Sequence, residues 1–147
     1  MTSPEWFVSA ISNAPEHHFV EVDGAKVHYS LWGDHLKPGL FFIHGYSANT
    51  NWWDFIAPHF LNDFCVVAVD LSGNGESDHR ENYSQELYAK ELKAICEDRE
   101  WSSATFVAHS MGGSISLKAT SFFPEIFTQL ILLDSIVVMP PDKARPM

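Results

Sequence analysis

The sequence contains few cysteines and few basic residues. Cys65 and Cys96 are the only cysteines in 147 residues, which excludes a disulfide scaffold and a zinc site built from four cysteines. We interpret them as a buried strand thiol and a thiol on a helix face, as in a reduced cytosolic protein. Lysine and arginine together number 9 against 19 aspartates and glutamates, a formal charge of −10. This balance repels nucleic acid and anionic membrane surfaces, so neither is an expected partner.

A long hydrophobic segment is also lacking. The longest apolar stretch, 130–139, is interrupted by Asp134 and Ser135 and is too short to cross a bilayer. The first residues have no basic stretch leading into an apolar one, so we expect no secretory signal and a cytoplasmic protein. The length, with 46% hydrophobic and 14% aromatic residues, suits one globular domain.

Hydrophobic patterning predicts an α/β fold. Segments 18–23 and 26–32 are typical of two strands, and Asp23-Gly24 between them indicates a hairpin turn. Later apolar runs do not alternate and are typical of strands buried on both faces of a parallel sheet: 40–43, 64–69, 105–108 and 130–133. Two antiparallel strands followed by alternating strands and helices predict a mostly parallel sheet.

Helical spacing fills the segments between these strands. One helix is predicted after Ser84, which is a suitable N-cap, and a second is ended by Pro124. A third is expected over 52–60, where Pro58 should kink or split it. A short helix is expected in the first dozen residues, with Pro4 at its start.

The most informative segment is 105–113, a buried strand that leads directly into a helix. Ser110 lies at the junction, where a tight strand-to-helix turn exposes a hydroxyl at the carboxyl edge of the sheet. Such a turn requires small residues two positions before and after the serine, and Ala108 and Gly112 occupy them. Ser110 could instead only cap the helix, but the strand-to-helix context and Gly112-Gly113 favour a nucleophile.

Three motifs, each at the end of a predicted strand, resemble the α/β-hydrolase superfamily of the serine-nucleophile type. They are an oxyanion loop at 44–46, an Asp-x-x-Gly-x-Gly-x-Ser loop at 70–77 and a nucleophile elbow at 108–112. Ala108 departs from the glycine usual in the family. The resemblance covers nearly all of the chain and implies the α/β-hydrolase fold, truncated before the cap and the last strands.

The resemblance also implies roles for individual residues. Ser110 would attack a carbonyl carbon to form an acyl-enzyme, and the backbone N–H groups of Tyr46 and Met111 would hold the oxyanion. His44 would support the oxyanion loop from behind, and we expect His109 to point into the fold and pack.

The substrate class implied by the resemblance is a small molecule with an ester, thioester or related acyl bond. Carbon–carbon bond hydrolases and perhydrolases share the motifs and stay open as alternatives. Serine at 110 argues against epoxide hydrolases and haloalkane dehalogenases, whose members carry aspartate at this position.

No cofactor or metal is predicted. The loop containing Gly73 and Gly75 lacks a dinucleotide or P-loop fingerprint, so we interpret it as a tight turn fixed by Asp70 and Ser77. No His-x-x-x-His pair occurs, and the adjacent His17 and His18 of the first strand should face opposite ways.

A catalytic base is missing, because no histidine follows Ser110 although the family order is serine, acid, histidine. Asp134 is a candidate acid, or a turn residue at a strand end. His79 or His44 would need an unusual geometry to act as the base. We therefore interpret 1–147 as one incomplete α/β-hydrolase domain, inactive by itself, whose last residues from 136 resemble the start of a cap.

A function of another class stays open. Without further strands, the run 130–133 becomes an apolar sheet edge, which native proteins normally cover. The chain would then be a non-catalytic binding or assembly module that pairs through this edge. Its partner would be a second copy or a complementing chain, which either supplies the missing histidine or supplies none.

Overall fold

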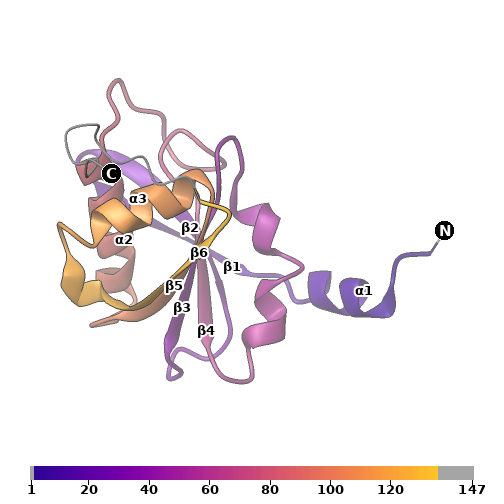
Figure 1. Ribbon diagram of the computed structural model, residues 1–147. Helices are drawn as coiled ribbons and strands as arrows, with labels where there is room; N and C mark the ends of the chain where they lie inside the picture. Colours follow the sequence, from indigo (N-terminus) through magenta and orange to yellow (C-terminus); the bar gives the residue numbers. More distant parts are fainter. Residues whose placement is uncertain (1, 136–147) are drawn as a thin grey trace, which may run out of the picture.

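The computed structural model describes residues 2–135, which form a mixed sheet with helical segments on both faces (Figure 1). The strands are β1 Glu16–Val22, β2 Ala25–Trp32, β3 Gly39–Ile43, β4 Cys65–Val69, β5 Ala104–His109 and β6 Phe127–Leu133. The α-helices are α1 Glu5–Ile11, α2 Gln85–Asp98 and α3 Met111–Ala119. The 3-10 turns are η1 Thr50–Trp53, η2 Ala57–Phe60 and η3 Pro124–Ile126.

The sheet has the strand order β1-β2-β4-β3-β5-β6. β2 pairs antiparallel with β1 and β4, whereas the β3–β4, β3–β5 and β5–β6 pairs are parallel. The predicted α/β class, a mostly parallel sheet with an antiparallel N-terminal hairpin, is therefore confirmed. At the hairpin turn, Asp23 and Gly24 have φ of 47° and 79°, as a two-residue turn between twisted strands requires.

Each face of the sheet has its own hydrophobic core. α2 and α3 cover one face, over a cluster that includes the fully buried Phe41 and Phe106. η1 and η2 cover the other face, where the Trp53 ring stacks on Phe42 with 4.6 Å between centroids. Because both faces are covered, β3 and β4 are buried at every position, as their continuous apolar runs predict.

α2 begins where its sequence predicts. The Ser84 hydroxyl accepts a hydrogen bond from the Leu87 backbone N–H at 3.0 Å, which satisfies one of the free donors of the first turn. Leu92, Ile95 and Cys96 face the core. Cys96 and Cys65 are both buried free thiols, on a helix and a strand as expected.

The helix expected over 52–60, kinked or split at Pro58, is split into two short pieces, but both are 3-10 turns rather than α-helix. Pro58 lies in the first turn of η2, where the missing N–H of proline is tolerated. The expectation about the last strand is wrong. Segment 130–133 is not buried on both faces: Ile131, Leu132 and Leu133 are 39%, 38% and 41% exposed. Among the described residues β6 pairs only with β5, which leaves this edge open. The cap start expected from 136 onward lies outside the described residues.

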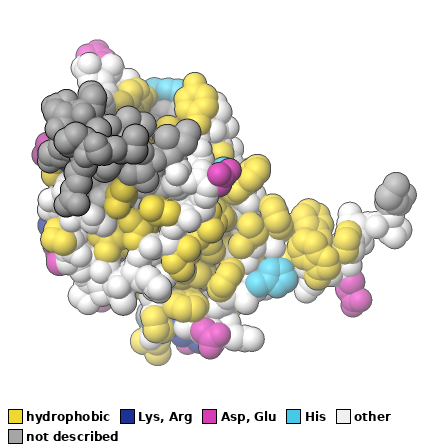
Figure 2. Space-filling model, viewed as in Figure 1, with side chains coloured by type: hydrophobic (Ala, Val, Ile, Leu, Met, Phe, Trp, Pro, Cys, Tyr) yellow, Lys and Arg dark blue, Asp and Glu magenta, His cyan; other side chains and the backbone are white. Residues whose placement is uncertain are grey.

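α1 projects from the body of the protein beside the 3-10 turns (Figure 1). Pro4 precedes its first residue, as predicted. The Phe7 ring packs on Phe55 at 5.8 Å and the Trp6 ring on His59 at 6.0 Å. Hydrophobic side chains gather along α1 and on the adjoining surface of the body (Figure 2).

Candidate functional site

Ser110 occupies a strained turn between β5 and α3. Its φ of 51° and ψ of −117° lie outside the regions favoured by residues with a side chain, as in a nucleophile elbow. Its hydroxyl makes no capping hydrogen bond, so the helix-cap interpretation does not explain this serine. The backbone N–H donates instead to the carbonyl of Leu133 at 3.0 Å, which fixes the turn against the end of β6.

The elbow packs against the loop that follows β3, and glycines make this contact possible. A Cβ on Gly112 would collide with the carbonyl oxygen of His44. A Cβ on Gly45 would lie 2.8 Å from His109 Nδ1 and 3.2 Å from the Cβ of Ser110. The oxyanion loop and the nucleophile turn therefore lie in direct contact, as the motif order implies.

Two backbone donors are free beside Ser110. Within residues 2–135, neither the Tyr46 nor the Met111 backbone N–H donates to a protein acceptor. Met111 is the first residue of α3, where an N–H has no partner within the helix. Tyr46 as a whole residue is 81% exposed. Unpaired N–H groups of this kind can stabilise developing negative charge on an oxygen.

His44 is buried between the two loops that follow β3 and β4. Its Nε2 accepts a hydrogen bond from the Leu71 backbone N–H at 3.1 Å, and its Nδ1 lies 2.7 Å from the carbonyl of Gly45. Burial lowers the pKa of His44, against the opposing effects of the Gly45 carbonyl and the Asp70 carboxylate. A neutral imidazole with its proton on Nδ1 satisfies both contacts.

The loop after β4 is fixed by Asp70, as its sequence predicts. The Asp70 carboxylate accepts backbone N–H bonds from Thr50 at 2.7 Å and Glu76 at 2.9 Å. The Ser77 hydroxyl donates to the Asp70 carbonyl at 2.5 Å and accepts from the His28 N–H at 2.7 Å. The loop is a tight turn held by the residues expected to hold it.

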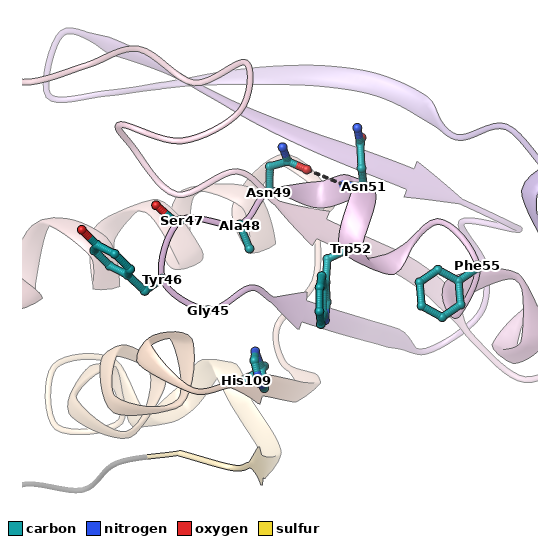
Figure 3. A pocket seen from close by; sticks show the side chains of 9 residues that line it. All are labelled: Gly45, Tyr46, Ser47, Ala48, Asn49, Asn51, Trp52, Phe55 and His109. Atoms are coloured by element: carbon teal, nitrogen blue, oxygen red, sulfur yellow. Dashed lines mark hydrogen bonds between the residues drawn. The ribbon is translucent and has the colours of Figure 1, made fainter.

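A cavity of about 500 Å³ opens beside the elbow, along the loop 45–52 (Figure 3). Trp52, Phe55 and His109 form its aromatic wall, with the Trp52 and His109 rings stacked at 5.9 Å. A second hollow of about 280 Å³, lined by Tyr83, Tyr88 and Met111 among others, lies on the other side of Tyr46. His109 lines the first cavity and Met111 lines the second hollow, so the two sequence neighbours of Ser110 each face one of them.

The expectation that His109 packs inside the fold is wrong, because its ring lines the cavity and is partly exposed. Along β5 burial alternates, so that Ala104, Phe106 and Ala108 face α2 and α3 while His109 faces η1. The alternation is weak in the sequence because Val107 is apolar on the same side as His109. Sequence reasoning also missed Trp52 and Phe55, since apolar spacing alone does not separate core from cavity wall.

The described residues provide no base for Ser110. No imidazole hydrogen-bonds its hydroxyl within 2–135, His44 uses both ring nitrogens elsewhere, and His79 is exposed. Asp134 follows β6 with φ of 45° and an exposed side chain. It is one residue beyond Leu133, whose carbonyl holds the Ser110 N–H. Its role as triad acid stays a prediction.

Membrane-spanning helices and metal-binding clusters are both absent from residues 2–135. None of the helices within 2–135 has the length and hydrophobicity needed to span a bilayer. Over the same residues, histidine, cysteine, aspartate and glutamate do not gather in groups of three or more that could hold a metal ion.

The fold and the three strand-end motifs define an α/β hydrolase. The model of the α/β-hydrolase fold family matches residues 38–146, so the chain belongs to this family. A serine hydrolase-like protein of Mus musculus is 33% identical over 108 residues, which are 71% of this chain and 35% of that protein. Epoxide hydrolase 4 of Homo sapiens is 29% identical over 123 residues, which are 80% of this chain and 34% of that protein.

Solved structures show the same relationship. The thioesterase domain from the curacin biosynthetic pathway is 28% identical and superposes with a TM-score of 0.78, covering 90% of this chain and 48% of that one. The chain spans about a third of the length of the curated relatives described above.

Proposed function

We propose that this chain carries the nucleophile and the oxyanion hole of a serine hydrolase that cleaves ester, thioester or related acyl bonds. The observation that carries the proposal is the strained backbone of Ser110, whose hydroxyl does not cap α3. The backbone N–H groups of Met111 and Tyr46 are free of protein acceptors within residues 2–135. Related proteins with serine hydrolase-like and thioesterase names support acyl chemistry. One relative is named an epoxide hydrolase, and Ser110 suits that activity less well than the aspartate expected of epoxide hydrolases.

In the proposed reaction, the Ser110 oxygen forms a bond to the acyl carbon while its proton passes to a base. The carbonyl oxygen becomes an oxyanion and accepts hydrogen bonds from the N–H groups of Tyr46 and Met111. Each of these hydrogen bonds should accelerate the reaction by about a hundredfold or more. The oxyanion then collapses, the leaving group departs with the electron pair of the broken bond, and the acyl group stays on Ser110. Water completes the cycle by the same steps.

The proposal assigns the base to polypeptide other than residues 2–135, since no imidazole there contacts the serine. The curated relatives are about three times as long as their match to this chain, so a longer protein could contain the base. Without it, a serine hydroxyl is a weak nucleophile. We accordingly propose that the chain alone turns over esters poorly.

Acylation of Ser110 with an external base tests the proposal. The chain is incubated with p-nitrophenyl acetate and imidazole, and intact mass with peptide mapping locates the acetyl group. We expect one acetyl group on Ser110, none on Ser110→Ala, and an unchanged yield on Ser102→Ala, an exposed serine just before β5 and so at the opposite end of that strand from Ser110. A folded chain that is acetylated equally with Ser110→Ala contradicts the proposal. In a longer protein, unchanged ester hydrolysis by Ser110→Ala would contradict it as well.

The open edge of β6 favours a second candidate, a non-catalytic module that pairs through this strand. Among the described residues, β6 pairs on one side only and exposes Ile131, Leu132 and Leu133. Sedimentation equilibrium of the chain and of Leu132→Lys would test this candidate. A dimer that the substitution dissociates would support it, and a soluble monomer would count against it.

A further inference from the structure

A further cavity, of about 340 Å³, lies at the carboxyl end of β4 and shares Asn49 and Asn51 of its wall with the cavity beside the elbow. Its wall comes from the β1–β2 hairpin, the segment around η1 and the loop after β4, and includes His17, Phe19, Asn51 and Glu76. No catalytic or binding role has been assigned to these residues above. Concave sites with a few convergent polar groups are where proteins bind small ligands.

The cavity contains a chain of three hydrogen-bonded side chains. His28 Nδ1 lies 2.8 Å from Asp70 Oδ2, and His28 Nε2 lies 2.9 Å from His17 Nδ1. Asp70 and His28 are each 1% exposed, whereas His17 is exposed at the outer end. These residues come from three separate elements, so the arrangement exists only in the folded protein.

The order of hydrogen-bond donors and acceptors along these three side chains starts from the charge of Asp70. Burial by itself would raise the pKa of Asp70, but hydrogen bonds from His28, Glu76 and Thr50 outweigh burial and lower it. An ionised carboxylate only accepts, so His28 donates to it from Nδ1. In the tautomer that leaves His28 Nε2 as an acceptor, His17 donates from Nδ1 and presents the lone pair of its own Nε2. Within 2–135 that nitrogen makes no hydrogen bond.

The charge around the cavity is negative. Asp70 is buried in its wall, and the exposed Glu76 carboxylate lines it without an ion pair among the described residues. No lysine or arginine within residues 2–135 lines the cavity. Phe19 adds an apolar surface, with its ring 5.1 Å from that of His28. Such a wall attracts a cation with a short apolar body and repels anions.

We propose that this cavity is a second binding site, for a small organic cation with N–H donors such as a primary ammonium. The ammonium donates to His17 Nε2, Glu76 supplies the opposite charge, and the alkyl part lies on Phe19. None of these contacts involves Ser110, so the proposal stands or fails separately from the proposed hydrolase function.

Nuclear magnetic resonance can test the site directly. Propylammonium chloride is titrated into the labelled protein at constant ionic strength and about pH 8, where a free imidazole is neutral. The backbone amide shifts of Gly75 and of position 76, which line this cavity and not the one beside the elbow, report binding in every variant. Tetramethylammonium chloride serves as the control ligand, because it has the same charge and no N–H donor.

The matched variants are His17→Phe, Glu76→Gln and, as a control, His18→Phe. His18 is the neighbouring strand residue on the opposite face, where its ring stacks on Tyr29 at 5.3 Å. We expect saturable binding of propylammonium with a dissociation constant of about 1–10 mM, in keeping with its few heavy atoms. His17→Phe should weaken binding by about tenfold, Glu76→Gln by about threefold, and His18→Phe by less than about twofold.

Three outcomes would overturn the proposal. Shifts that increase linearly without saturation would show that the cavity does not bind the cation. Equal binding of tetramethylammonium would show attraction by charge alone, without donation to His17. Equal loss in His18→Phe and His17→Phe would show a general effect on the hairpin rather than a contact with the ligand.

Discussion

The buried imidazole of His44 joins the two loops of the candidate active site, because its Nε2 accepts the Leu71 backbone N–H at 3.1 Å. His44 follows β3 and begins the oxyanion loop, while Leu71 follows β4 and belongs to the turn held by Asp70. The contact positions Tyr46 indirectly, through the backbone of its own loop. A residue with both ring nitrogens occupied supports the site and does not act as its base.

This contact predicts a pH dependence of stability. The pKa of His44 in the folded protein lies below the value of 6.5 for a free histidine. As the pH falls below about 6.5 the unfolded chain takes up the proton first, so the stability provided by neutral His44 is complete above that pH and is lost as the pH falls through the folded-state pKa. We expect a smaller loss between pH 7.5 and 5.5 in His44→Gln, whose amide oxygen can still accept from Leu71.

Urea denaturation of both proteins at the two pH values measures this difference. The exposed His35 provides the control, because His35→Gln should leave the pH dependence of wild type unchanged. Equal losses of unfolding free energy in wild type and His44→Gln would contradict the assignment.

Gly45 provides a prediction about the contact between loop and elbow. In Gly45→Ala the new methyl group meets His109 Nδ1 at 2.8 Å and the Cβ of Ser110 at 3.2 Å, so the loop must move away. We expect a loss of stability of about 1–3 kcal/mol, as for overpacked sites, and acetylation of Ser110 slowed by about tenfold or more.

The control for this variant is Gly24→Ala. A Cβ on Gly24 meets nothing within 4 Å, but φ of 79° makes alanine strained there. This variant should lose about 1 kcal/mol of stability and keep the rate of acetylation. If both variants acetylate at the wild-type rate, the close packing of Gly45 does not position the oxyanion loop.

Two substitutions at Tyr46 distinguish the contribution of its backbone N–H from that of its side chain. Tyr46→Ala should acetylate at a rate within about twofold of wild type, because only the backbone N–H is proposed to contact the oxyanion and the residue is 81% exposed. Tyr46→Pro removes the N–H and should slow acetylation by about a hundredfold. Circular dichroism of both variants checks that they fold. A similar rate for the two would mean that Tyr46 is not an oxyanion donor.

Local patterns in the sequence predict much of this fold. Three local features depend on residues close in sequence, and the structure contains all of them: the hairpin turn at Asp23-Gly24, the helix cap at Ser84 and the elbow at Ser110. Continuous apolar runs correctly predict β3 and β4, because these strands have neighbours on both sides and helical segments on both faces.

Contacts between distant residues could not be predicted in the same way. His28 meets Asp70 across 42 positions and His17 across 11, and no local pattern indicates either pairing. The side of His109 depends on which face of β5 each helical segment covers, which periodicity does not specify. β6 is exposed because it lies at the edge of the sheet, and no segment of residues 2–135 pairs with its outer side.

A buried ion pair beneath the loop after β4 provides the last prediction. Glu91 of α2 is fully buried, and its carboxylate accepts hydrogen bonds from the Ser72 hydroxyl and backbone N–H and lies 3.3 Å from Arg80 Nη2. Burial raises the pKa of Glu91, against the opposing effects of Ser72 and Arg80. Arg80 also donates to the carbonyl of Val22 at 2.8 Å, which joins the loop to the hairpin.

Removing one partner leaves the other buried without compensation. Arg80→Met should therefore cost about 3–5 kcal/mol of unfolding free energy, measured in urea at pH 7. The double variant Arg80→Met, Glu91→Met should recover a large part of that loss, because two apolar side chains need no counter-charge. Lys90→Met serves as a control, because Lys90 forms exposed ion pairs with Asp23 and Glu86 that should contribute less than about 1 kcal/mol. If Arg80→Met costs no more than Lys90→Met, the Glu91 carboxylate does not depend on Arg80, and the hydrogen bonds from Ser72 are sufficient to satisfy it.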